Sequence, residues 1–159
     1  MGKIYFIMGV AGSGKSTIGE LLAKKLNMPF FDADDFHPPA NIQKMAAGTP
    51  LDDADRLPWL ENIARTARQH TGRQGVVIAC SALKSQYRSV LAAGIEAHVQ
   101  WIYLQGNMET IRQRMENRKD HFMPPGLLRS QFDALEPPQE ALIVDISESP
   151  EAIVARLPG

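Results

Sequence analysis

The sequence has little of what would mark a secreted, membrane-bound or nucleic-acid-binding protein. Its 159 residues include a single cysteine, Cys80, which rules out an internal disulfide and is compatible with a reducing compartment. No stretch approaches the roughly 20 apolar residues of a membrane span. The formal net charge of −1 gives no electrostatic basis for binding nucleic acid or an anionic membrane. We therefore expect a cytoplasmic protein that binds neither.

Composition and length indicate one globular domain. Hydrophobic residues make up 44% of the chain and charged residues 22%, which is ordinary for a soluble protein. The length predicts a single domain over residues 1–159, large enough to bury a core. The apolar N-terminal run is about seven residues long and leads directly into a glycine-rich loop, so we do not expect a signal peptide.

That glycine-rich loop is the strongest motif in the chain. It reads Gly9-Val10-Ala11-Gly12-Ser13-Gly14-Lys15-Ser16, followed by Thr17. The order Gly, four residues, Gly-Lys, Ser is the P-loop pattern. A β-prone run over residues 3–8 precedes it, and apolar residues at helical spacing follow over 17–26. The bland alternative, a glycine-rich turn, does not explain these flanks.

A strand, a glycine loop and a helix together aim backbone N–H groups and the positive end of the helix at a polyphosphate. We therefore predict that residues 9–17 bind ATP. Lys15 is expected to reach the β- and γ-phosphates, and the Ser16 hydroxyl to bind Mg²⁺. The histidines have no metal-ligand spacing, so the Mg²⁺ that accompanies ATP is the metal to expect.

Short apolar segments alternate with helical patterns along the whole chain. The expected strands are 3–8, 29–35, 75–80, 97–104 and 142–146. The expected helices are 17–26, 38–48, one capped by Asp53 or Asp55 with Pro58 in its first turn, 83–93, one from Asn107, 127–135 and 150–157. This alternation predicts a three-layer α/β/α sandwich around a five-stranded, mostly parallel sheet.

Carboxylates gather where the second strand is expected to end. Ligands of such sheets bind at the C-terminal ends of the strands. The period-two geometry of a strand puts Asp32 and Asp34 on one face. A kinase for a small alcohol needs one carboxylate to deprotonate the attacking hydroxyl and another to help hold Mg²⁺. We predict that Asp34 is the base and Asp32 the metal residue; the alternative is that both are capping or solvated loop carboxylates.

Two other residues of types that often act in catalysis or metal binding are expected to have no such role here. Asp145 follows an apolar run, as in a magnesium-binding motif, but the expected strand order places its strand at the end of the sheet, away from the P-loop. Cys80 has no base close to it in sequence, so we expect a buried structural thiol.

A basic segment comes just before a Pro-Pro-Gly break. It contains Arg112, Arg114, Arg118, Lys119 and His121. We predict a small helical lid over about residues 114–127 that closes over ATP and excludes water. Arg114 and Arg118 share one helix face and are expected to bind the nucleotide, with Arg118 also acting in catalysis. The alternative is a solvated helix face.

Several segments resemble bacterial gluconate kinases (gluconokinases). They are Met8 to Ser16, Asp34-x-x-His37-Pro38-x-x-Asn41-x-x-Lys44-Met45, Leu51-x-Asp53-x-Asp55-Arg56-x-Pro58-Trp59-Leu60, Cys80-Ser81-Ala82-Leu83-Lys84-x-x-Tyr87-Arg88, and Arg118-Lys119-x-His121-Phe122 with Phe132. The resemblance implies a nucleoside-monophosphate-kinase-like fold and transfer of the ATP γ-phosphate to the 6-hydroxyl of D-gluconate, giving 6-phospho-D-gluconate and ADP. It also implies a homodimer.

A sugar acid presents one carboxylate and a row of hydroxyls, so its site needs cations and polar groups. The candidate substrate residues are Asp34, His37, Arg56, Ser81, Lys84 and Arg88. His37 fits a cap of the following turn equally well. Arg56 and Lys84 have the alternatives of a helix salt bridge and a solvated first-turn lysine.

Shikimate kinase is the nearest rival, with other small-molecule P-loop kinases behind it. It shares the P-loop and an Asp-x-Asp after the second strand, but Cys80-Ser81-Ala82 stands where its glycine triplet is expected. A nucleotide-binding regulatory switch is the rival from another class. The chain has no Asn-Lys-x-Asp guanine signature, and a switch has no need of Asp34, Arg56 and Lys84 together.

Overall fold

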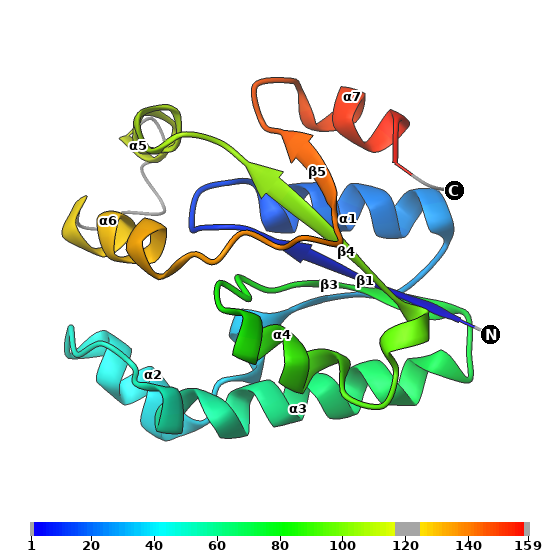
Figure 1. Ribbon diagram of the computed structural model, residues 1–159, viewed down its shortest axis with the longest axis horizontal. Helices are drawn as coiled ribbons and strands as arrows, with labels where there is room; N and C mark the ends of the chain where they lie inside the picture. The colour runs from blue at the N-terminus through cyan, green and yellow to red at the C-terminus, as the bar shows by residue number, and fades with distance from the viewer. Residues whose placement is uncertain (1, 117–124, 158–159) are drawn as a thin grey trace.

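The computed structural model describes residues 2–116 and 125–157 and contains a five-stranded parallel sheet (Figure 1). Its strands are β1 (Lys3–Met8), β2 (Phe30–Asp32), β3 (Gly75–Ala79), β4 (Val99–Gln105) and β5 (Leu142–Asp145). They lie in the order β2-β3-β1-β4-β5, and every neighbouring pair is parallel. The predicted α/β fold class is confirmed.

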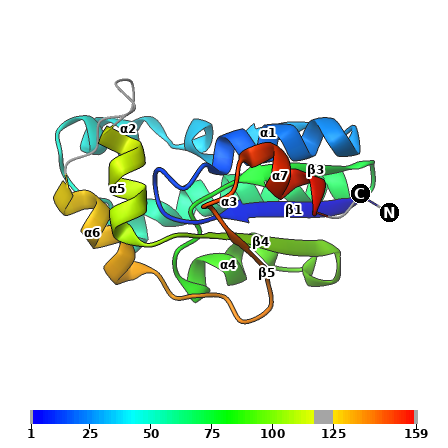
Figure 2. The same ribbon diagram turned by 90° about the horizontal axis from the view of Figure 1, so that it is seen from above.

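Helices cover both faces of the sheet and its carboxyl end (Figures 1 and 2). One face carries α1 (Lys15–Leu26) and α7 (Pro150–Ala155), and the other α3 (Asp53–Thr71) and α4 (Ser85–Ala92). Beyond the carboxyl ends of the strands lie α2 (Pro39–Ala46), α5 (Met108–Glu116) and α6 (Pro125–Ala134). Two 3₁₀ turns, η1 (Ala33–Phe36) and η2 (Glu96–His98), complete the described elements. None of these helices is long and apolar enough to cross a bilayer.

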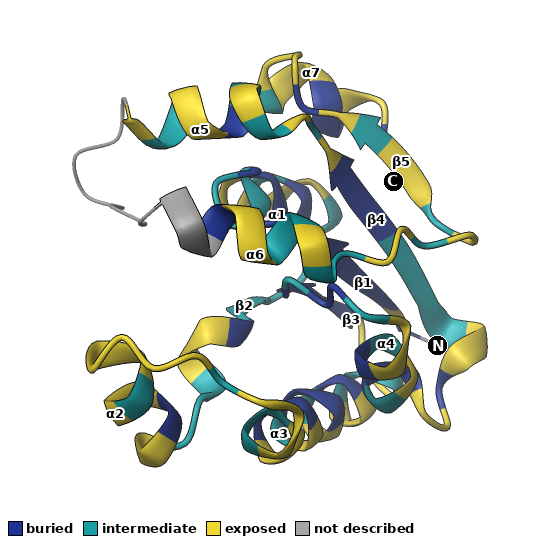
Figure 3. Cartoon of the chain, turned by 60° about the vertical axis from the view of Figure 1, so that its left-hand side comes forward, coloured by how far each residue is buried: buried dark blue, intermediate teal, exposed yellow. Residues whose placement is uncertain are grey.

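The core forms two layers because successive side chains of β1 point to opposite faces of the sheet. Ile4 and Phe6 pack toward α3 and α4, whereas Tyr5 and Ile7 pack toward α1 and α7. All four side chains are buried. Burial on both faces is typical of a central parallel strand. Figure 3 shows the contrast with the edge strand β5, where Ile143 is 58% exposed.

Two local expectations were wrong. The second strand ends at Asp32 and the chain turns at once into η1, because the Asp32 Oδ1 atom accepts a hydrogen bond from the Asp34 N–H at 3.0 Å. Helix α3 is capped by Asp52, which forms a reciprocal capping box with Asp55. The helix therefore starts at Asp53, and Pro58 lies in its second turn, where it removes one intrahelical hydrogen bond.

Candidate active site

A cavity of about 630 Å³ opens at the carboxyl ends of β1, β2 and β3. It is lined by Ala11, Gly12, Gly14, Lys15, Ser16, Thr17, Asp32, Asp34, His37, Met45, Ala79, Cys80, Ser81, Met115 and Gln131. The three strand ends thus meet at one crevice, as parallel topology requires. Asp145 is absent from this lining; its carboxylate lies on the edge strand β5 and accepts a hydrogen bond from the Ser147 N–H at 2.9 Å.

The P-loop connects β1 to α1 and leaves the start of the helix open to the cavity. Gly12 and Gly14 have φ angles of +79° and +98°, which favour glycine. A Cβ on Gly12 would lie 2.7 Å from the Cγ atom of Met115, so α5 rests directly on the loop. Among the described residues, no side chain caps the N-terminus of α1. The backbone N–H groups at this end of the helix can therefore donate hydrogen bonds to an anionic phosphate.

Not every loop residue faces the cavity. Three residues of the loop, Gly9, Val10 and Ser13, are buried and do not line the cavity. The Ser13 hydroxyl has no hydrogen-bond partner among the described residues and lies against Gly9. Val10 contacts the Lys15 side chain through its backbone: its carbonyl oxygen accepts a hydrogen bond from the Lys15 Nζ atom at 3.1 Å.

The Lys15 ammonium sits at the base of the cavity. Burial lowers the pKa of Lys15, whereas the charges of Asp34 and Asp32 act in the opposite direction. A cation already partly desolvated interacts strongly with an arriving phosphate. The predicted position of Lys15 at the phosphates is therefore compatible with its place in the fold.

Ser16 and Asp32 meet across the cavity floor. The Ser16 hydroxyl donates to the Asp32 Oδ2 atom at 2.7 Å. Mg²⁺ prefers oxygen ligands and usually keeps several waters when it binds beside phosphates, so one hydroxyl and one carboxylate fit its needs. Asp32 also caps η1 through its other oxygen.

Asp34 lies in η1, beside Asp32 and facing Lys15 and His37. Burial raises the pKa of Asp34, as does the neighbouring Asp32 charge; Lys15 and His37 lower it. A carboxylate with a raised pKa accepts a proton more readily than an ordinary one, which suits a general base.

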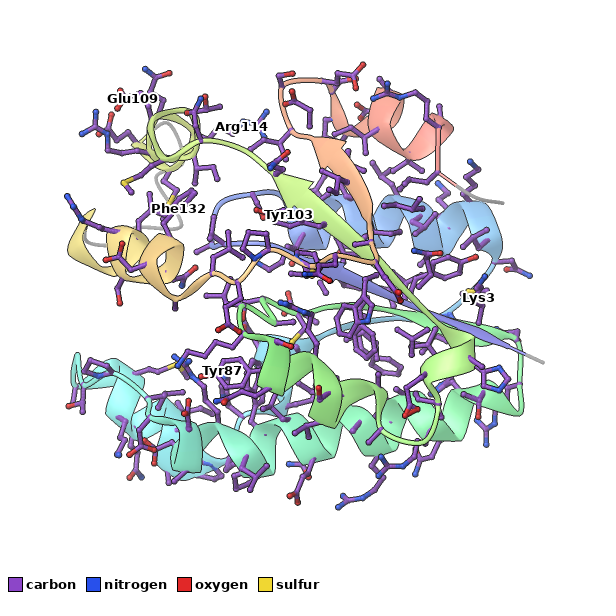
Figure 4. All side chains as sticks on the ribbon, in the orientation of Figure 1. Lys3, Tyr87, Tyr103, Glu109, Arg114 and Phe132 are labelled. Atoms are coloured by element: carbon purple, nitrogen blue, oxygen red, sulfur yellow. The ribbon has the colours of Figure 1, made fainter. Side chains whose placement is uncertain are left out.

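A polar cluster at α3 and the start of α4 holds two of the three predicted substrate cations, and neither of the two is in the cavity lining. The Arg56 Nη1 atom donates to the Tyr87 hydroxyl at 2.8 Å, and that hydroxyl donates to the Asp53 Oδ1 atom at 2.6 Å. The Lys84 Nζ atom lies 3.7 Å from the same carboxylate oxygen. Both cations also lie over the Tyr87 ring, at 5.4 and 5.6 Å from its centroid. Figure 4 labels Tyr87, which lies on α4.

Comparison with known proteins identifies the family. A family model described as shikimate kinase matches residues 11–142. The thermosensitive gluconokinase of Escherichia coli (strain K12) is 49% identical over 140 residues, covering 87% of this chain and 74% of that protein. The chain belongs to the gluconokinase family. The resemblance inferred from the motifs is confirmed.

Solved structures agree with this assignment. The crystal structure of a gluconokinase from Sinorhizobium meliloti 1021 has a TM-score of 0.86 and 39% identity, covering 96% of this chain and 87% of that one. A shikimate kinase from Bacteroides thetaiotaomicron has a TM-score of 0.69 at 20% identity, covering 97% and 95% of the two chains. The likeness to this solved structure is one of fold.

In this gluconokinase-family chain, two predicted arginines are held away from the cavity lining. Arg88 donates to the carbonyl oxygens of Ala82 and Glu136, at 2.7 and 2.8 Å. It lines a separate depression between α4 and the segment after α6. Arg114 donates to the Ile146 carbonyl oxygen and does not line the cavity either. Arg118 and most of the predicted lid lie outside the described residues.

Sequence reasoning missed two polar residues around the cavity of this gluconokinase-family site. Gln131 on α6 lines the cavity, and its Oε1 atom accepts a hydrogen bond from the Ala11 N–H at 2.7 Å. No sequence signal pointed to it, because its place depends on how α6 docks. Asn41 is 3% exposed and contacts His37. Asn41 belongs to one of the motifs that resemble the family, but the motif alone assigns it no role.

Proposed function

We propose that the protein transfers the γ-phosphoryl group of ATP to the 6-hydroxyl of D-gluconate, giving 6-phospho-D-gluconate and ADP. The observation that carries this proposal is the position of Asp34 and His37 in the cavity wall, facing Lys15 on one side and Arg56 on the other. A phosphate site and an acceptor site thus share one crevice. The substrate named for the family, gluconate, fits the acceptor side.

ATP is held by the P-loop in this proposal. The open N-terminus of α1 and the loop amides receive the phosphates, with Lys15 at the β- and γ-positions. Ser16 and Asp32 would hold Mg²⁺, which would neutralise phosphate charge. Thr17 lies at the cavity edge, within reach of the nucleotide.

The transfer itself needs little covalent chemistry from the protein. Asp34 takes the proton of the 6-hydroxyl, and the freed oxygen forms a bond to the γ-phosphorus. The bond from that phosphorus to the β–γ bridging oxygen breaks, and ADP leaves with the electron pair. Lys15 stabilises the spread negative charge, and we assign the same role to Arg118 of the lid.

The acceptor is oriented by the side of the cavity that faces α3 and α4. We assign Arg56 and Lys84 to the gluconate carboxylate, and Ser81 and His37 to its hydroxyls. Asp53 and Tyr87 keep the two cations together before the substrate arrives. Arg88 is assigned a structural role instead, because both of its contacts are to backbone carbonyls.

We also propose that the chain works as a cytoplasmic homodimer with a lid over about residues 114–127. The lid would begin in the last turn of α5, where Met115 lies against Gly12 of the loop. Sedimentation equilibrium of the purified protein would measure the oligomeric state directly.

A coupled ADP-release assay over a set of sugar acids tests the function. We expect ADP release that depends on D-gluconate, with none from shikimate. Equal ATP hydrolysis with and without sugar acids would contradict the proposal and favour a regulatory ATPase. Release with shikimate alone would instead favour the rival kinase.

A further inference from the structure

Asn41 is the most buried polar side chain near the acceptor side of the cavity. It lies on α2 and is 3% exposed. Its Nδ2 atom lies 2.9 Å from the Asp55 carbonyl oxygen and 3.2 Å from the Nδ1 atom of His37. Both contacts use the same nitrogen of the amide.

These two contacts determine where the His37 proton lies. The Asp55 carbonyl oxygen can only accept, so the atom facing it must be the amide nitrogen of Asn41 rather than its oxygen. The second hydrogen of that nitrogen faces His37 Nδ1, which must therefore accept. A neutral imidazole that accepts at Nδ1 carries its proton on Nε2.

The His37 ring cannot turn away from this arrangement without losing its packing. It stacks on Trp59 with ring centroids 4.4 Å apart and an interplanar angle of 11°. Trp59 is itself fixed, because its Nε1–H donates to the Ala33 carbonyl oxygen at 2.6 Å. His37 lines the cavity, so Nε2 is the ring nitrogen left to contact a ligand there.

The charged groups facing His37 are Asp34 from η1 and Arg56 from α3. Burial is the largest influence and lowers the pKa of His37; Arg56 lowers it further, and Asp34 raises it. Protonation at Nδ1 would also set two donors, the ring N–H and the Asn41 amide, against each other. The ring is therefore neutral at neutral pH.

We propose that Asn41 is a positioning residue that holds His37 in the Nε2–H tautomer, so that His37 donates a hydrogen bond from Nε2 to a hydroxyl oxygen of the acceptor. Only the identity of that acceptor rests on the proposed gluconate kinase activity. The tautomer itself follows from the contacts of Asn41. A hydroxyl that receives this hydrogen bond keeps its own proton free to point at Asp34.

A second histidine supplies an internal control. The His70 Nδ1 atom lies 2.9 Å from the Thr66 carbonyl oxygen, which can only accept. His70 must therefore carry a proton on Nδ1. His37 and His70 are therefore expected to be opposite tautomers, which a two-dimensional ¹⁵N–¹H spectrum of the imidazole rings distinguishes. The variants His37→Gln and His70→Gln assign the signals.

At pH 8 we expect the His37 ring to be neutral and protonated on Nε2, and His70 to be protonated on Nδ1. An Nδ1–H or fully protonated His37 overturns the proposal. This measurement needs no substrate and no turnover, so it stands even if gluconate is not the acceptor. Failure of gluconate to support ADP release would count against the proposed function alone.

Asn41→Asp tests the consequence for catalysis. The new carboxylate accepts from His37 Nδ1–H, which raises the His37 pKa and leaves Nε2 of the neutral ring without a proton. At pH 8 we expect kcat/KM for gluconate to fall about 10- to 100-fold, as for a lost hydrogen bond to substrate, with KM for ATP nearly unchanged.

The decisive readout is how the ratio of variant to wild-type kcat/KM depends on pH. Acidification converts His37 of the variant to the imidazolium form, which donates from both nitrogens, so the ratio should rise between pH 8 and pH 6. A ratio that stays flat means that Asn41 acts only through stability and overturns the positioning role.

His37→Phe completes the design. It keeps an aromatic ring on Trp59 but removes the donor, so its kcat/KM should fall by a similar factor. In the double variant Asn41→Asp/His37→Phe, the ratio to His37→Phe alone should lose its pH dependence. Should Asn41→Asp fail to fold, the wild-type spectrum still decides the proposal.

Discussion

The side chain of Gln131 accepts a hydrogen bond from the backbone N–H of Ala11 at 2.7 Å, although 120 positions separate the two residues. Ala11 belongs to the P-loop, and Gln131 belongs to the helix that follows the predicted lid. Both line the cavity. A phosphate oxygen bound in the loop would compete with the glutamine for the same amide, so the position of α6 and the occupancy of the loop are coupled.

Gln131→Glu should weaken ATP binding. The substitution keeps the acceptor oxygen but adds a negative charge beside the phosphates, at a cost of about 1–4 kcal/mol for charges about 4 Å apart. We expect KM for ATP to rise at least about fivefold, by the usual 1.4 kcal/mol per factor of ten. Gln131→Leu, which is similar in size but removes the acceptor, serves as the control and should bind ATP at least as well as wild type. An unchanged KM in Gln131→Glu, measured by steady-state kinetics, would contradict the coupling.

Lys15→Ala and Asp34→Asn should both abolish turnover but differ in binding. Lys15 contacts the phosphates in the proposed site, so its loss should weaken ATP affinity about 10- to 100-fold, as for loss of a charge-assisted contact. Asp34 acts on the acceptor, and its loss should lower kcat by about 10²- to 10⁴-fold while ATP affinity stays nearly intact. Titration calorimetry with ATP separates the two. A large loss of ATP binding in Asp34→Asn would overturn its role as base.

Tyr87→Phe should raise KM for gluconate more than it changes kcat. The hydroxyl joins Arg56 to Asp53, whereas the ring under the two cations is retained. Loss of one such hydrogen-bonded link is worth about 1 kcal/mol, or roughly a fivefold rise in KM. Gln86→Ala is the matched control, because Gln86 contacts the other oxygen of Asp53 at 3.0 Å without touching either cation. Equal effects of both substitutions would indicate that only Asp53 matters.

Two glycines three positions apart should respond oppositely to alanine. Gly75 has φ +94°, and a Cβ there would overlap the backbone of Lys3, its partner in the ladder between β1 and β3. Gly72 has φ −83° and no atom within 4 Å of the added Cβ among the described residues. We expect Gly75→Ala to lose more than about 2 kcal/mol of unfolding free energy and Gly72→Ala to gain about 0.4–1 kcal/mol. Urea unfolding followed by tryptophan fluorescence measures both, and equal midpoints would refute the expectation.

The elements most accessible to sequence reasoning were those with strong local signals. The P-loop, the β3 strand and the parallel sheet follow from the glycine motif, from hydrophobic runs and from their alternation with helical patterns. The position of β5 at the edge of the sheet was also predicted, and it excluded Asp145 as a magnesium ligand. Such features depend on a few neighbouring residues and on topology.

Features that depend on one local side-chain contact or on tertiary docking were not predicted. The chain turns after Asp32 instead of continuing as a strand, because the Asp32 carboxylate accepts a hydrogen bond from the Asp34 N–H. Arg88 resembled a substrate cation in the motif, but two backbone carbonyls hold its guanidinium. Gln131 gave no signal at all, since only the packing of α6 brings it to the loop.

Cys80 should be chemically silent in the folded protein although it lines the cavity. The residue is 1% exposed, and burial raises the pKa of Cys80 to about 12 in spite of the nearby Lys15 charge. At pH 8 a pKa of about 12 leaves roughly one thiol in 10⁴ as the reactive thiolate. We expect iodoacetamide to modify the native protein very slowly and the urea-unfolded protein within minutes, as measured by intact mass. Because Cys80 is the only cysteine, each added label reports this site, and the Cys80→Ser variant gives the background. Complete modification of the folded protein within minutes would show that the thiol is accessible and ionised, and would make it a candidate catalytic group.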